Sequence, residues 1–458
     1  MRPDTSIPSP VAIIGAGRSG VATARFLLDR GIGVFISDAC AREKLEKTLA
    51  EAGLAQVAHE AGAHTERILE ARAIVLSPGV RSDLDILVRA RLRAIPVWSE
   101  MEFGYRMSTA QFLAVTGSSG KSTTVSMLGE IMKAAGRPTV VAGNIGVPVI
   151  TLAPPLPAGG VVAAEVSSFQ LETIDTFKPA VAVILNLLKN HLDRYDSAQE
   201  YFDAKKQIAR NMDGGCSLVL NACDPLLVDW APKVAGGTSV VWFGAMMAGS
   251  RSVWPEGTRL MQGGDRKTET VADLSSMVLR GPHNRMNAAA AAAVALCAGA
   301  AGDAVERGVC GFRGLAHRLQ FAGAVDGVEY FNDSKSTTAE SIECAVTAFG
   351  RNVHLIAGGR DKGCDFSVVN ESLKKHVKQV VAIGEAAGRI ETLWGGVVPV
   401  ARAASLETAV AAARARAVRG DVVVLSPGCS SFDMFKNFEE RGEVFMRIVG
   451  NMTKERGV

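Results

Sequence analysis

The sequence predicts an α/β protein of three domains, in which helices cover both faces of parallel sheets. Short apolar runs rich in β-branched residues alternate with helical patterns along the chain, which is typical of such sheets. Two glycine-rich turns each follow an apolar run and precede a helical pattern. At 458 residues the chain is also too long for one ordinary domain.

The expected strands are apolar runs bounded by polar residues or glycine. In chain order they cover Val11–Ile14, Gly33–Ser37, Ile74–Leu76, Phe112–Val115, Val161–Val166, Val181–Leu185, Ser217–Leu220, Val328–Phe331, Val353–Ala357, Val380–Ile383 and Asp421–Leu425. A polar connection near Ser108–Gln111 and a turn cluster near Gly311–Gly314 mark the expected boundaries. They divide the chain into domains of residues 1–108, 109–313 and 314–458, all of ordinary size.

Composition excludes several classes of protein. A net charge of +3 gives no reason to expect binding to nucleic acid or to an anionic membrane. The weakly polar run from Met286 to Gly302 is mostly alanine and glycine, so it predicts a close-packed helix and no membrane insertion. The eight cysteines are scattered without a C-x-x-C pair, which favours reduced thiols in the cytoplasm.

The first glycine-rich turn is Gly15-Ala-Gly17-Arg-Ser-Gly20, directly after a predicted strand. Asp38 closes the next predicted strand, at the distance expected for a contact to a ribose. The pattern favours a dinucleotide, as in a dehydrogenase, but a sugar linked to a nucleoside diphosphate would meet a helix N-terminus equally well. A third interpretation is that the glycines serve only helix–strand packing.

The second turn is the segment Thr116-Gly117-Ser118-Ser119-Gly120-Lys121-Ser122-Thr123. Backbone N–H groups of such a loop wrap phosphate oxygens at a helix N-terminus. Lys121 would place a positive charge on the β- and γ-phosphates, and the Ser122 or Thr123 hydroxyl could bind Mg²⁺. The alternative, an ordinary turn of small residues, does not require this order of glycine, lysine and hydroxyls. The segment therefore predicts binding of a nucleoside triphosphate.

Polar side chains follow the next predicted strands of the central domain. Glu165 ends one strand, and Asn186 ends another shortly before His191. Ligands of open α/β sheets bind beyond the carboxyl ends of the strands, where these residues would gather near Lys121. A carboxylate and an imidazole there could bind Mg²⁺, although each alone could be a helix cap or a surface histidine. Lys205 lies on a predicted helix, and periodicity alone predicts that it is solvated.

The motifs together resemble the Mur ligases, in order and over nearly the whole chain. The matching segments are Thr116 to Ser122, Glu165-Val-Ser-Ser-Phe-Gln-Leu, Asn190-His-Leu-Asp-Arg-Tyr, Gly-Leu-Ala-His317-Arg318, Asn332-Asp-Ser-Lys335-Ser-Thr337, Gly358-Gly-Arg-Asp-Lys362 and Leu425-Ser-Pro-Gly-Cys-Ser-Ser431-Phe-Asp-Met-Phe-Lys-Asn-Phe438-Glu-Glu-Arg-Gly442. The resemblance is strongest to the D-glutamate-adding branch of the family. One departure is the pair Ala39-Cys40, where the family has Thr-Arg near the uracil.

This resemblance implies a Rossmann-like N-terminal domain that binds UDP-linked substrate, a P-loop-type ATPase central domain, and a Rossmann-like C-terminal domain for the amino acid. The implied reaction is ATP-dependent ligation of D-glutamate to UDP-N-acetylmuramoyl-L-alanine through an acyl phosphate, in cytoplasmic peptidoglycan precursor synthesis. The implied cofactors are ATP, Mg²⁺ at two sites, and a CO₂-derived carbamate on Lys205. We expect a monomer.

The resemblance also implies roles for individual residues. Lys121, His191, Lys205, Arg318 and Lys335 match catalytic positions. ATP-binding positions match Gly117, Ser118, Ser119, Gly120, Lys121, Ser122, Thr123, Asn284, Asn287, Arg318 and Asp333. Positions that bind the UDP-linked substrate match Gly17, Arg18, Ser19, Asp38, Ser77, Asn144 and Ser167. The D-glutamate positions match Thr337, Lys362, Ser431 and Phe438, and the metal positions match Ser122, Glu165, His191 and carbamylated Lys205.

Two alternatives remain open at this point. The nearer is another amide ligase of the same superfamily, such as a different Mur ligase or a folylpolyglutamate synthetase. The farther is a nicotinamide-dependent oxidoreductase built on the Gly15 turn, which leaves the Lys121 loop and the segments around Lys362 and Ser431 without a role.

Overall fold

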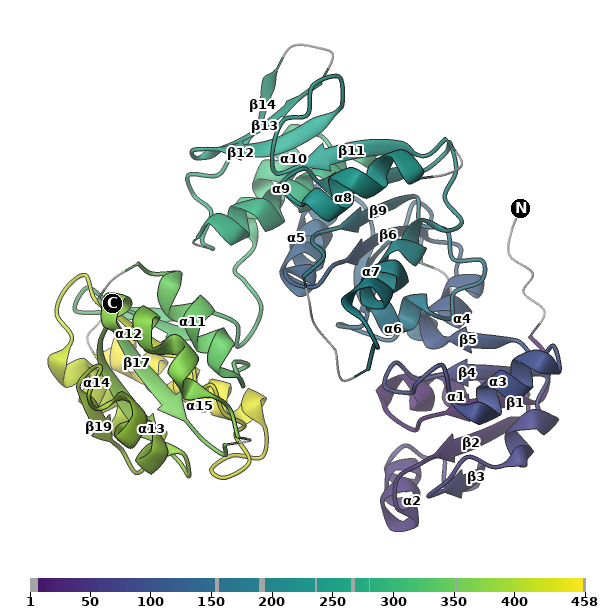
Figure 1. Cartoon of the computed structure of the whole chain (residues 1–458), viewed down its shortest axis with the longest axis horizontal. Helices are drawn as coiled ribbons and strands as arrows, with labels where there is room; N and C mark the ends of the chain where they lie inside the picture. The colour runs from purple at the N-terminus through teal and green to yellow at the C-terminus, as the bar shows by residue number, and fades with distance from the viewer. Residues whose placement is uncertain are drawn as a thin grey trace. The chain divides into compact units, whose positions relative to one another are not determined.

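The computed structural model describes residues 7–152, 156–188, 194–234, 237–264, 268–279, 281–350, 352–361 and 363–455. Within them the chain forms two compact units, of which the first takes in the chain up to Met277 together with His283–Gly311. The second comprises Val278–Pro282 and the chain from Phe312 onward. The first unit contains two sheets and the second contains one (Figure 1).

The first sheet is parallel, with strand order β3-β2-β1-β4-β5. Its strands are β1 (Val11–Ile14), β2 (Val34–Asp38), β3 (Ala58–Ala61), β4 (Ala73–Leu76) and β5 (Val97–Ser99). Its helices are α1 (Arg18–Leu28), α2 (Arg42–Glu51), the 3₁₀ turn η1 (Glu66–Glu70), α3 (Asp85–Leu92) and α4 (Glu100–Arg106). Because β1 is central and buried throughout, the glycine turn that follows it lies at the middle of the carboxyl edge.

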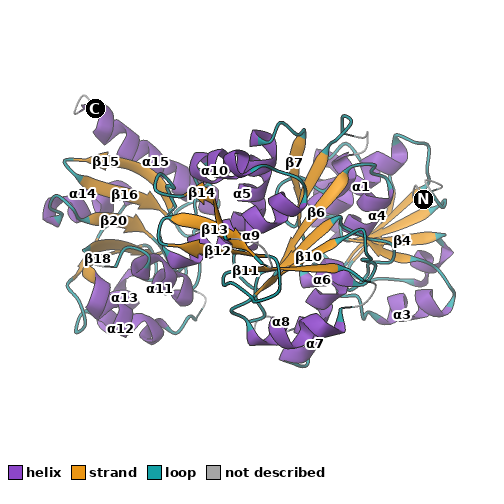
Figure 2. Cartoon of the chain, turned by 90° about the horizontal axis from the view of Figure 1, so that it is seen from above, coloured by secondary structure: helices purple, strands orange, loops and turns teal. Residues whose placement is uncertain are grey.

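The second sheet has the order β14-β13-β12-β11-β10-β9-β6-β8-β7, with antiparallel pairing only between β12, β13 and β14. Its strands are β6 (Gln111–Thr116), β7 (Thr139–Gly143), β8 (Val161–Glu165), β9 (Val181–Ile184), β10 (Ser217–Asn221), β11 (Ser239–Phe243), β12 (Ser252–Glu256), β13 (Arg259–Gly263) and β14 (Glu269–Asp273). Its α-helices are α5 (Lys121–Ala134), α6 (Ser168–Leu171), α7 (Ala198–Lys206), α8 (Pro225–Trp230), α9 (Pro282–Cys297) and α10 (Gly302–Gly311). The 3₁₀ turns are η2 (Val149–Leu152), η3 (Gln207–Ala209) and η4 (Ala231–Lys233). Figure 2 shows α5 and α10 on one side of this sheet and α7 and α8 on the other.

The third sheet has the order β15-β16-β20-β17-β18-β19 and is parallel except for the hairpin of β15 and β16. Its strands are β15 (Gln320–Val325), β16 (Val328–Asn332), β17 (Val353–Gly358), β18 (Val377–Ile383), β19 (Val400–Arg402) and β20 (Val422–Leu425). Its helices are α11 (Ala339–Thr347), the 3₁₀ turn η5 (Phe366–Val369), α12 (Asn370–His376), α13 (Ala387–Trp394), α14 (Leu406–Arg416) and α15 (Phe438–Glu455). Separate apolar clusters cover its two faces.

These sheets confirm the predicted α/β class, and every predicted strand has a counterpart. Strands β3, β5, β7, β11–β15 and β19 were not predicted. The antiparallel strands β12–β14 were missed because their polar, partly exposed residues give no apolar run. The alanine-rich segment forms α9 as expected, and its alanines from Ala288 to Ala293 are fully buried. Among the described helices, none is both long and apolar enough to cross a bilayer.

Candidate functional site

The first glycine turn is held in shape by three close contacts. Gly15 has φ +94°, and a Cβ there would lie 2.8 Å from the Ser77 Cβ. A Cβ on Gly20 would lie 1.9 Å from the Gly15 carbonyl oxygen, so only glycine lets α1 start this close to the strand. The Ser77 hydroxyl donates a 2.8 Å hydrogen bond to the same carbonyl. The turn therefore presents the N-terminus of α1 to a ligand.

Asp38 lies beside this turn at the end of β2. Its Oδ2 accepts a hydrogen bond from the Ala16 N–H at 2.7 Å, and its Oδ1 accepts one from the Cys40 N–H at 2.8 Å. Burial alone would raise the pKa of Asp38, but these backbone hydrogen bonds outweigh it and lower the pKa. Asp38 is therefore an anion that fixes the turn and keeps lone pairs for a hydroxyl group.

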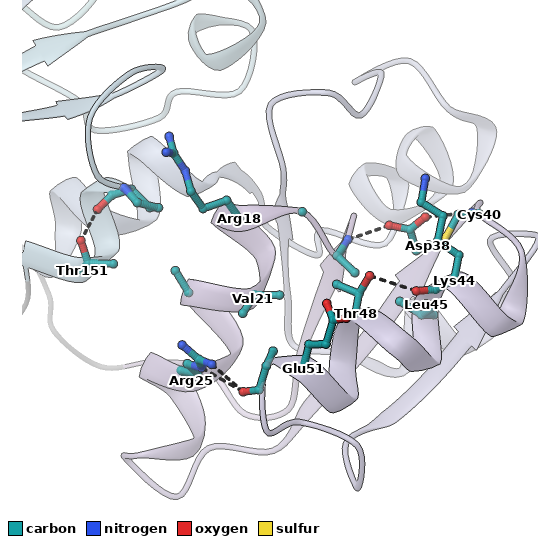
Figure 3. Close-up of a pocket in the computed structure, with 15 residues that line it drawn as sticks. Arg18, Val21, Arg25, Asp38, Cys40, Lys44, Leu45, Thr48, Glu51 and Thr151 are labelled. Carbon is teal, nitrogen blue, oxygen red and sulfur yellow. Dashed lines mark hydrogen bonds between the residues drawn. The ribbon is translucent and has the colours of Figure 1, made fainter. Parts of the chain in front are cut away.

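A cavity of about 680 Å³ opens next to the turn, between α1 and α2 (Figure 3). Gly17, Arg18 and Asp38, all predicted to bind the UDP-linked substrate, line it. Cys40, which the sequence comparison placed near the uracil, also lines it. Sequence reasoning did not identify the other polar lining side chains, which are Arg25, Lys44, Thr48, Glu51 and Thr151. Thr151 comes from η2 in the second sheet region, so both sheet regions of the first unit contribute to this cavity.

The phosphate loop joins β6 to α5 as predicted. Gly120 caps α5 with φ +82°, and a Cβ there would lie 2.5 Å from the Asn287 Oδ1. Lys121 bends back over the loop, where its Nζ donates to the carbonyl oxygens of Gly117 at 2.9 Å and Ser118 at 3.1 Å. Ser122 is half-buried and Thr123 is buried at the start of α5. The ammonium and the helix N-terminus thus converge on the space that the loop surrounds.

Asn186, at the end of β9, occupies two donors of the phosphate loop. Its Oδ1 accepts hydrogen bonds from the Ser118 N–H at 3.0 Å and the Ser119 N–H at 2.9 Å. Beyond the strand, Leu188 and the Ser118 side chain exchange hydrogen bonds of 2.9 and 3.0 Å. A carboxamide oxygen therefore takes the place in which a phosphate oxygen would accept from the same amides.

The predicted ATP residues Asn284 and Asn287 lie on α9, beside the same loop. The Thr124 hydroxyl donates to Asn287 Oδ1 at 3.3 Å, and Asn287 Nδ2 donates to Asn284 Oδ1 at 3.3 Å. Asn284 is buried. The structure thus brings residues separated by more than 160 positions together at one loop.

Glu165 ends β8 and is fully buried. Its Oε1 accepts a 2.8 Å hydrogen bond from Asn144 Nδ2, while its Oε2 is buried without a hydrogen-bond partner among the described residues. An orphaned carboxylate oxygen in this place is a donor atom suited to a hard cation. Ser167, the next predicted polar residue, caps α6 and exchanges hydrogen bonds with Gln170.

Lys205 is buried on α7 with 1% of its surface exposed, so the solvated position predicted from periodicity is wrong. Its Nζ lies 4.4 Å from the centre of the Tyr201 ring. Burial and, to a smaller extent, the charge of Lys121 together lower the pKa of Lys205 to about 7, although the Glu165 carboxylate acts in the opposite direction. The periodicity argument failed because α7 is short and packs the Lys205 face against the sheet region that holds Glu165 and Lys121.

Two predicted site residues, His191 and Lys362, lie outside the described residues. Within the described ranges, no group of three His, Cys, Asp or Glu side chains is placed to hold a metal ion. Of the predicted metal ligands, Ser122, Glu165 and Lys205 are described, and all three belong to the first unit.

The second unit carries the remaining predicted residues around the carboxyl ends of β16 and β20. Asp333 is buried, and its carboxylate accepts from the Ser426 hydroxyl at 2.9 Å and the Leu319 N–H at 3.2 Å. Burial raises its pKa to about 7 against these hydrogen bonds and the charge of Arg318. Arg318 itself is exposed.

Phe438 lies beside the predicted residue Lys335 and beside His317. The Lys335 Nζ is 5.7 Å from the centre of its ring, and the His317 ring meets it edge-on at 6.1 Å. Ser431 is buried just after β20, and Thr337 is half-buried in the loop after β16. The structure therefore gathers the described members of the predicted amino-acid pocket at one edge of the third sheet.

Arg441 is a buried residue of this edge that sequence reasoning missed. Its Nε donates to the Ser334 hydroxyl at 2.9 Å, and its Nη2 donates to the carbonyl oxygens of Ser334 at 2.9 Å and Cys429 at 3.2 Å. Burial lowers its pKa to about 10. An arginine on an amphipathic helix is usually solvated, so periodicity gave no signal for its burial. The matching segment that ends at Gly442 contains Arg441 but assigned no role to it. A Cβ at the adjacent Gly442 would lie 2.0 Å from His317 Nδ1, so the helix packs closely here.

Known proteins resemble the chain over each of these regions. Residues 9–99 match the N-terminal domain of MurD-like Mur ligases, residues 115–295 match the Mur ligase middle domain, and residues 317–429 match the glutamate ligase domain of Mur ligases. The UDP-N-acetylmuramoylalanine--D-glutamate ligase of Koribacter versatilis (strain Ellin345) is 36% identical and aligns over 97% of this chain and 98% of its own length. The enzyme of the same name from Acidobacterium capsulatum is 39% identical over 96% of this chain and 95% of its own.

Solved structures agree with the fold. The UDP-N-acetylmuramate-alanine ligase MurC from Thermotoga maritima has a TM-score of 0.59 at 18% identity, covering 96% of this chain and 99% of that one. The UDP-N-acetylmuramoylalanyl-D-glutamyl-2,6-diaminopimelate--D-alanyl-D-alanyl ligase from Acinetobacter baumannii has a TM-score of 0.60 at 17% identity, covering 97% and 94%. At such identities the likeness concerns the fold alone, whereas the full-length relatives settle the family. The chain belongs to the Mur ligase family.

Proposed function

We propose that this ligase joins D-glutamate to UDP-N-acetylmuramoyl-L-alanine at the expense of ATP. The observation that carries the proposal is full-length similarity, at 36–39% identity, to relatives named for that reaction. A turn suited to a nucleoside diphosphate and a loop suited to a triphosphate occur in the same unit, which supports it. A nicotinamide-dependent enzyme would have no use for the loop suited to a triphosphate.

We assign the three substrates to three domains. Residues 1–108 bind the UDP-linked substrate, through Gly17, Arg18, Ser19, Asp38 and Ser77, with Asn144 and Ser167 added from the central domain. Residues 109–313 bind ATP, and residues 314–458 bind D-glutamate through Thr337, Lys362, Ser431 and Phe438. We also assign Arg318, Asp333 and Lys335 roles in binding ATP and the acyl phosphate.

The chemistry follows from the weakness of a carboxylate as an electrophile. A carboxylate oxygen of the L-alanyl group attacks the γ-phosphorus of ATP, the bond to the β-phosphate oxygen breaks, and ADP leaves. The amine of D-glutamate then attacks the acyl carbon, loses a proton, and expels phosphate from the tetrahedral intermediate. The Lys121 ammonium and the loop N–H groups stabilise the charge on the transferring phosphoryl group.

The donor set fits Mg²⁺, which in this reaction would neutralise triphosphate charge. Ser122 and Glu165 would supply oxygen ligands, and His191 would supply an imidazole nitrogen. The orphaned buried oxygen of Glu165 is the observation that supports this fit. We further propose that Lys205 reacts with CO₂ to form a carbamate. A pKa of about 7 leaves a large fraction of the amine neutral, and only the neutral amine attacks CO₂.

We place the reaction in the cytoplasm, because ATP and UDP-linked sugars are its substrates, and we propose that the chain works as a monomer.

Release of phosphate from ATP tests the proposal. It should require UDP-N-acetylmuramoyl-L-alanine together with D-glutamate, and L-glutamate should replace D-glutamate poorly. Lys121→Ala should abolish release, whereas Lys133→Ala, on an exposed face of the same helix, should not. Preferred use of L-lysine or diaminopimelate would assign the chain to another branch of the family, and cofactor reduction in place of phosphate release would overturn the proposal.

A further inference from the structure

A cluster of polar side chains joins the loop after β4 to Glu172, the residue that directly follows α6. At its centre is Glu172, whose side chain is 17% exposed. Its Oε1 accepts a 2.5 Å hydrogen bond from the Tyr195 hydroxyl, and its Oε2 accepts from the Ser82 hydroxyl at 2.6 Å and from Arg194 Nη2 at 3.2 Å. One carboxylate thus collects three donors, one of them from the first sheet region and two from the second.

Arg194 extends the cluster toward the first glycine turn. Its Nη2 also donates to the Val80 carbonyl oxygen at 3.2 Å, and its guanidinium lies 3.9 Å from the centre of the Phe169 ring. Val80 in turn packs on the turn, because a Cβ at Gly15 would lie 3.1 Å from the Val80 Cγ2. A shift of the Val80–Ser82 segment would therefore be felt at the glycine turn.

Tyr195 extends the cluster in the opposite direction. Its ring stacks on Phe169 at 6.0 Å and lies 5.4 Å from the ring of Tyr201, which contacts Lys205 Nζ at 4.4 Å. Burial, followed by the hydrogen bond to Glu172, raises the pKa of Tyr195, so the phenol keeps its proton and donates it. A continuous set of contacts therefore runs from Gly15 to Lys205 through Glu172.

We propose that Glu172 is a positioning residue that holds the two sheet regions of the first unit in register, so that the sugar-nucleotide carboxylate meets the γ-phosphate. The proposal rests on the proposed function, in which the two substrates bind on different sheets. Reacting atoms must lie within about 3–3.5 Å of each other, and a misplacement of about 1 Å can cost roughly a hundredfold in rate. Glu172 contacts neither substrate in this scheme.

The variant Glu172→Gln tests the proposal because it keeps the shape but removes the charge and one acceptor. We expect kcat/KM for the UDP-linked substrate to fall by at least about tenfold, while the KM for ATP stays within about twofold. Ser82→Ala and Tyr195→Phe, which each remove one donor, should cause smaller losses of the same kind. Their effects should not add to that of Glu172→Gln, since all three break one network.

Asp83→Asn is the matched control, since Asp83 lies on the same loop in an exposed ion pair with Arg81. Asp83→Asn should change neither kcat/KM for the UDP-linked substrate nor the KM for ATP. A rise in the KM for ATP in Glu172→Gln as large as the fall in kcat/KM for the UDP-linked substrate would overturn the proposal, and so would effects of Ser82→Ala and Glu172→Gln that add.

Hydrogen–deuterium exchange of the substrate-free protein separates this proposal from the proposed function. Amides of residues 79–83 should exchange faster in Glu172→Gln than in wild type or Asp83→Asn. If the wild-type chain fails to use the UDP-linked substrate, the proposed function fails, and exchange alone then decides the role of Glu172. If the amides of residues 79–83 exchange at the same rate in Glu172→Gln as in wild type, the proposed role of Glu172 is wrong, whether or not the proposed function holds.

Discussion

The carboxamide of Asn186 binds the backbone of Ser119 from both sides: its Oδ1 accepts from the Ser119 N–H at 2.9 Å, and its Nδ2 donates to the Ser119 carbonyl oxygen at 3.2 Å. The pair joins the end of β9 to the exposed tip of the phosphate loop. These hydrogen bonds help to hold the shape of the loop, and a triphosphate that used the same amides would have to displace one neutral acceptor.

Asn186→Asp should weaken ATP binding, because it places an anion where phosphate oxygens bind. At an effective dielectric constant of about 20, two like charges about 4 Å apart repel by about 4 kcal/mol, so we expect at least about a tenfold rise in the KM for ATP after solvent screening. The KM for D-glutamate should not change. Asn211→Asp is the control, since its carboxamide binds carbonyl oxygens of Asp175 and Phe177, away from the loop. An unchanged KM for ATP would show that phosphate does not use these amides.

Glu100 and Glu102 should respond oppositely to conversion into glutamine. Glu100 is buried where α4 meets η2; its Oε1 accepts from the Ile150 N–H at 2.8 Å, and its Oε2 has no partner among the described residues. Burial raises its pKa to about 7. Glu102, also buried, accepts from Arg106, Thr176 and neighbouring backbone N–H groups with both oxygens.

The sign of the effect at Glu100 follows from linkage. A carboxyl group whose pKa is higher in the folded state contributes stability that is fully present below its unfolded pKa and is lost as the pH rises through about 7. Glu100→Gln stays neutral, so its free energy of unfolding should exceed that of wild type by about 2–3 kcal/mol at pH 8 and by much less at pH 5. Glu102→Gln should be destabilised at both pH values, because its amide would face donors. Urea unfolding at the two pH values gives the measurement, and a constant difference for Glu100→Gln would contradict the assignment.

Recognition of D-glutamate should depend on charge at Lys362 and on the Ser431 hydroxyl. Each would bind one carboxylate of the amino acid, a charge-assisted contact that a neutral analogue lacks. Lys362→Ala should therefore raise the KM for D-glutamate by at least about tenfold with a smaller effect on the KM for ATP. D-glutamine and D-alanine should be poor acceptors. Lys374→Ala, which removes an exposed lysine paired with Glu371, is the control. A similar loss in both variants would indicate a general charge effect.

The sequence predicted the parts of this molecule that repeat a simple pattern. Buried strands such as β1 and β9 are continuous apolar runs, and the glycines of the two turns are required by backbone geometry, as at Gly120. It could not predict what depends on contacts between distant segments. Lys205, Arg441 and Glu100 are charged residues with buried side chains, and their burial is decided by the neighbouring elements and not by their own helices.

Lys205 provides the most demanding prediction, since periodicity argued against any role for it. If it is carbamylated, it acts as an anion, and Lys205→Ala should lose nearly all activity because a ligand of Mg²⁺, or the support of its bound water, is lost. Lys205→Arg should be no better, since it keeps a positive charge beside Lys121. Lys206→Ala is the control. Lys206 is the next residue on the same helix, but its side chain pairs with Asp203 and is not buried, unlike that of Lys205. Acetate or another short carboxylic acid, added to Lys205→Ala, should enter the vacated space and partly restore phosphate release. The restored rate of phosphate release should increase with the concentration of the acid. Lys121→Ala should show no such restoration, because it lacks a positive charge that a carboxylate cannot replace. An active Lys205→Arg, or a Lys205→Ala that no carboxylic acid restores, would show that the buried amine serves packing and not catalysis.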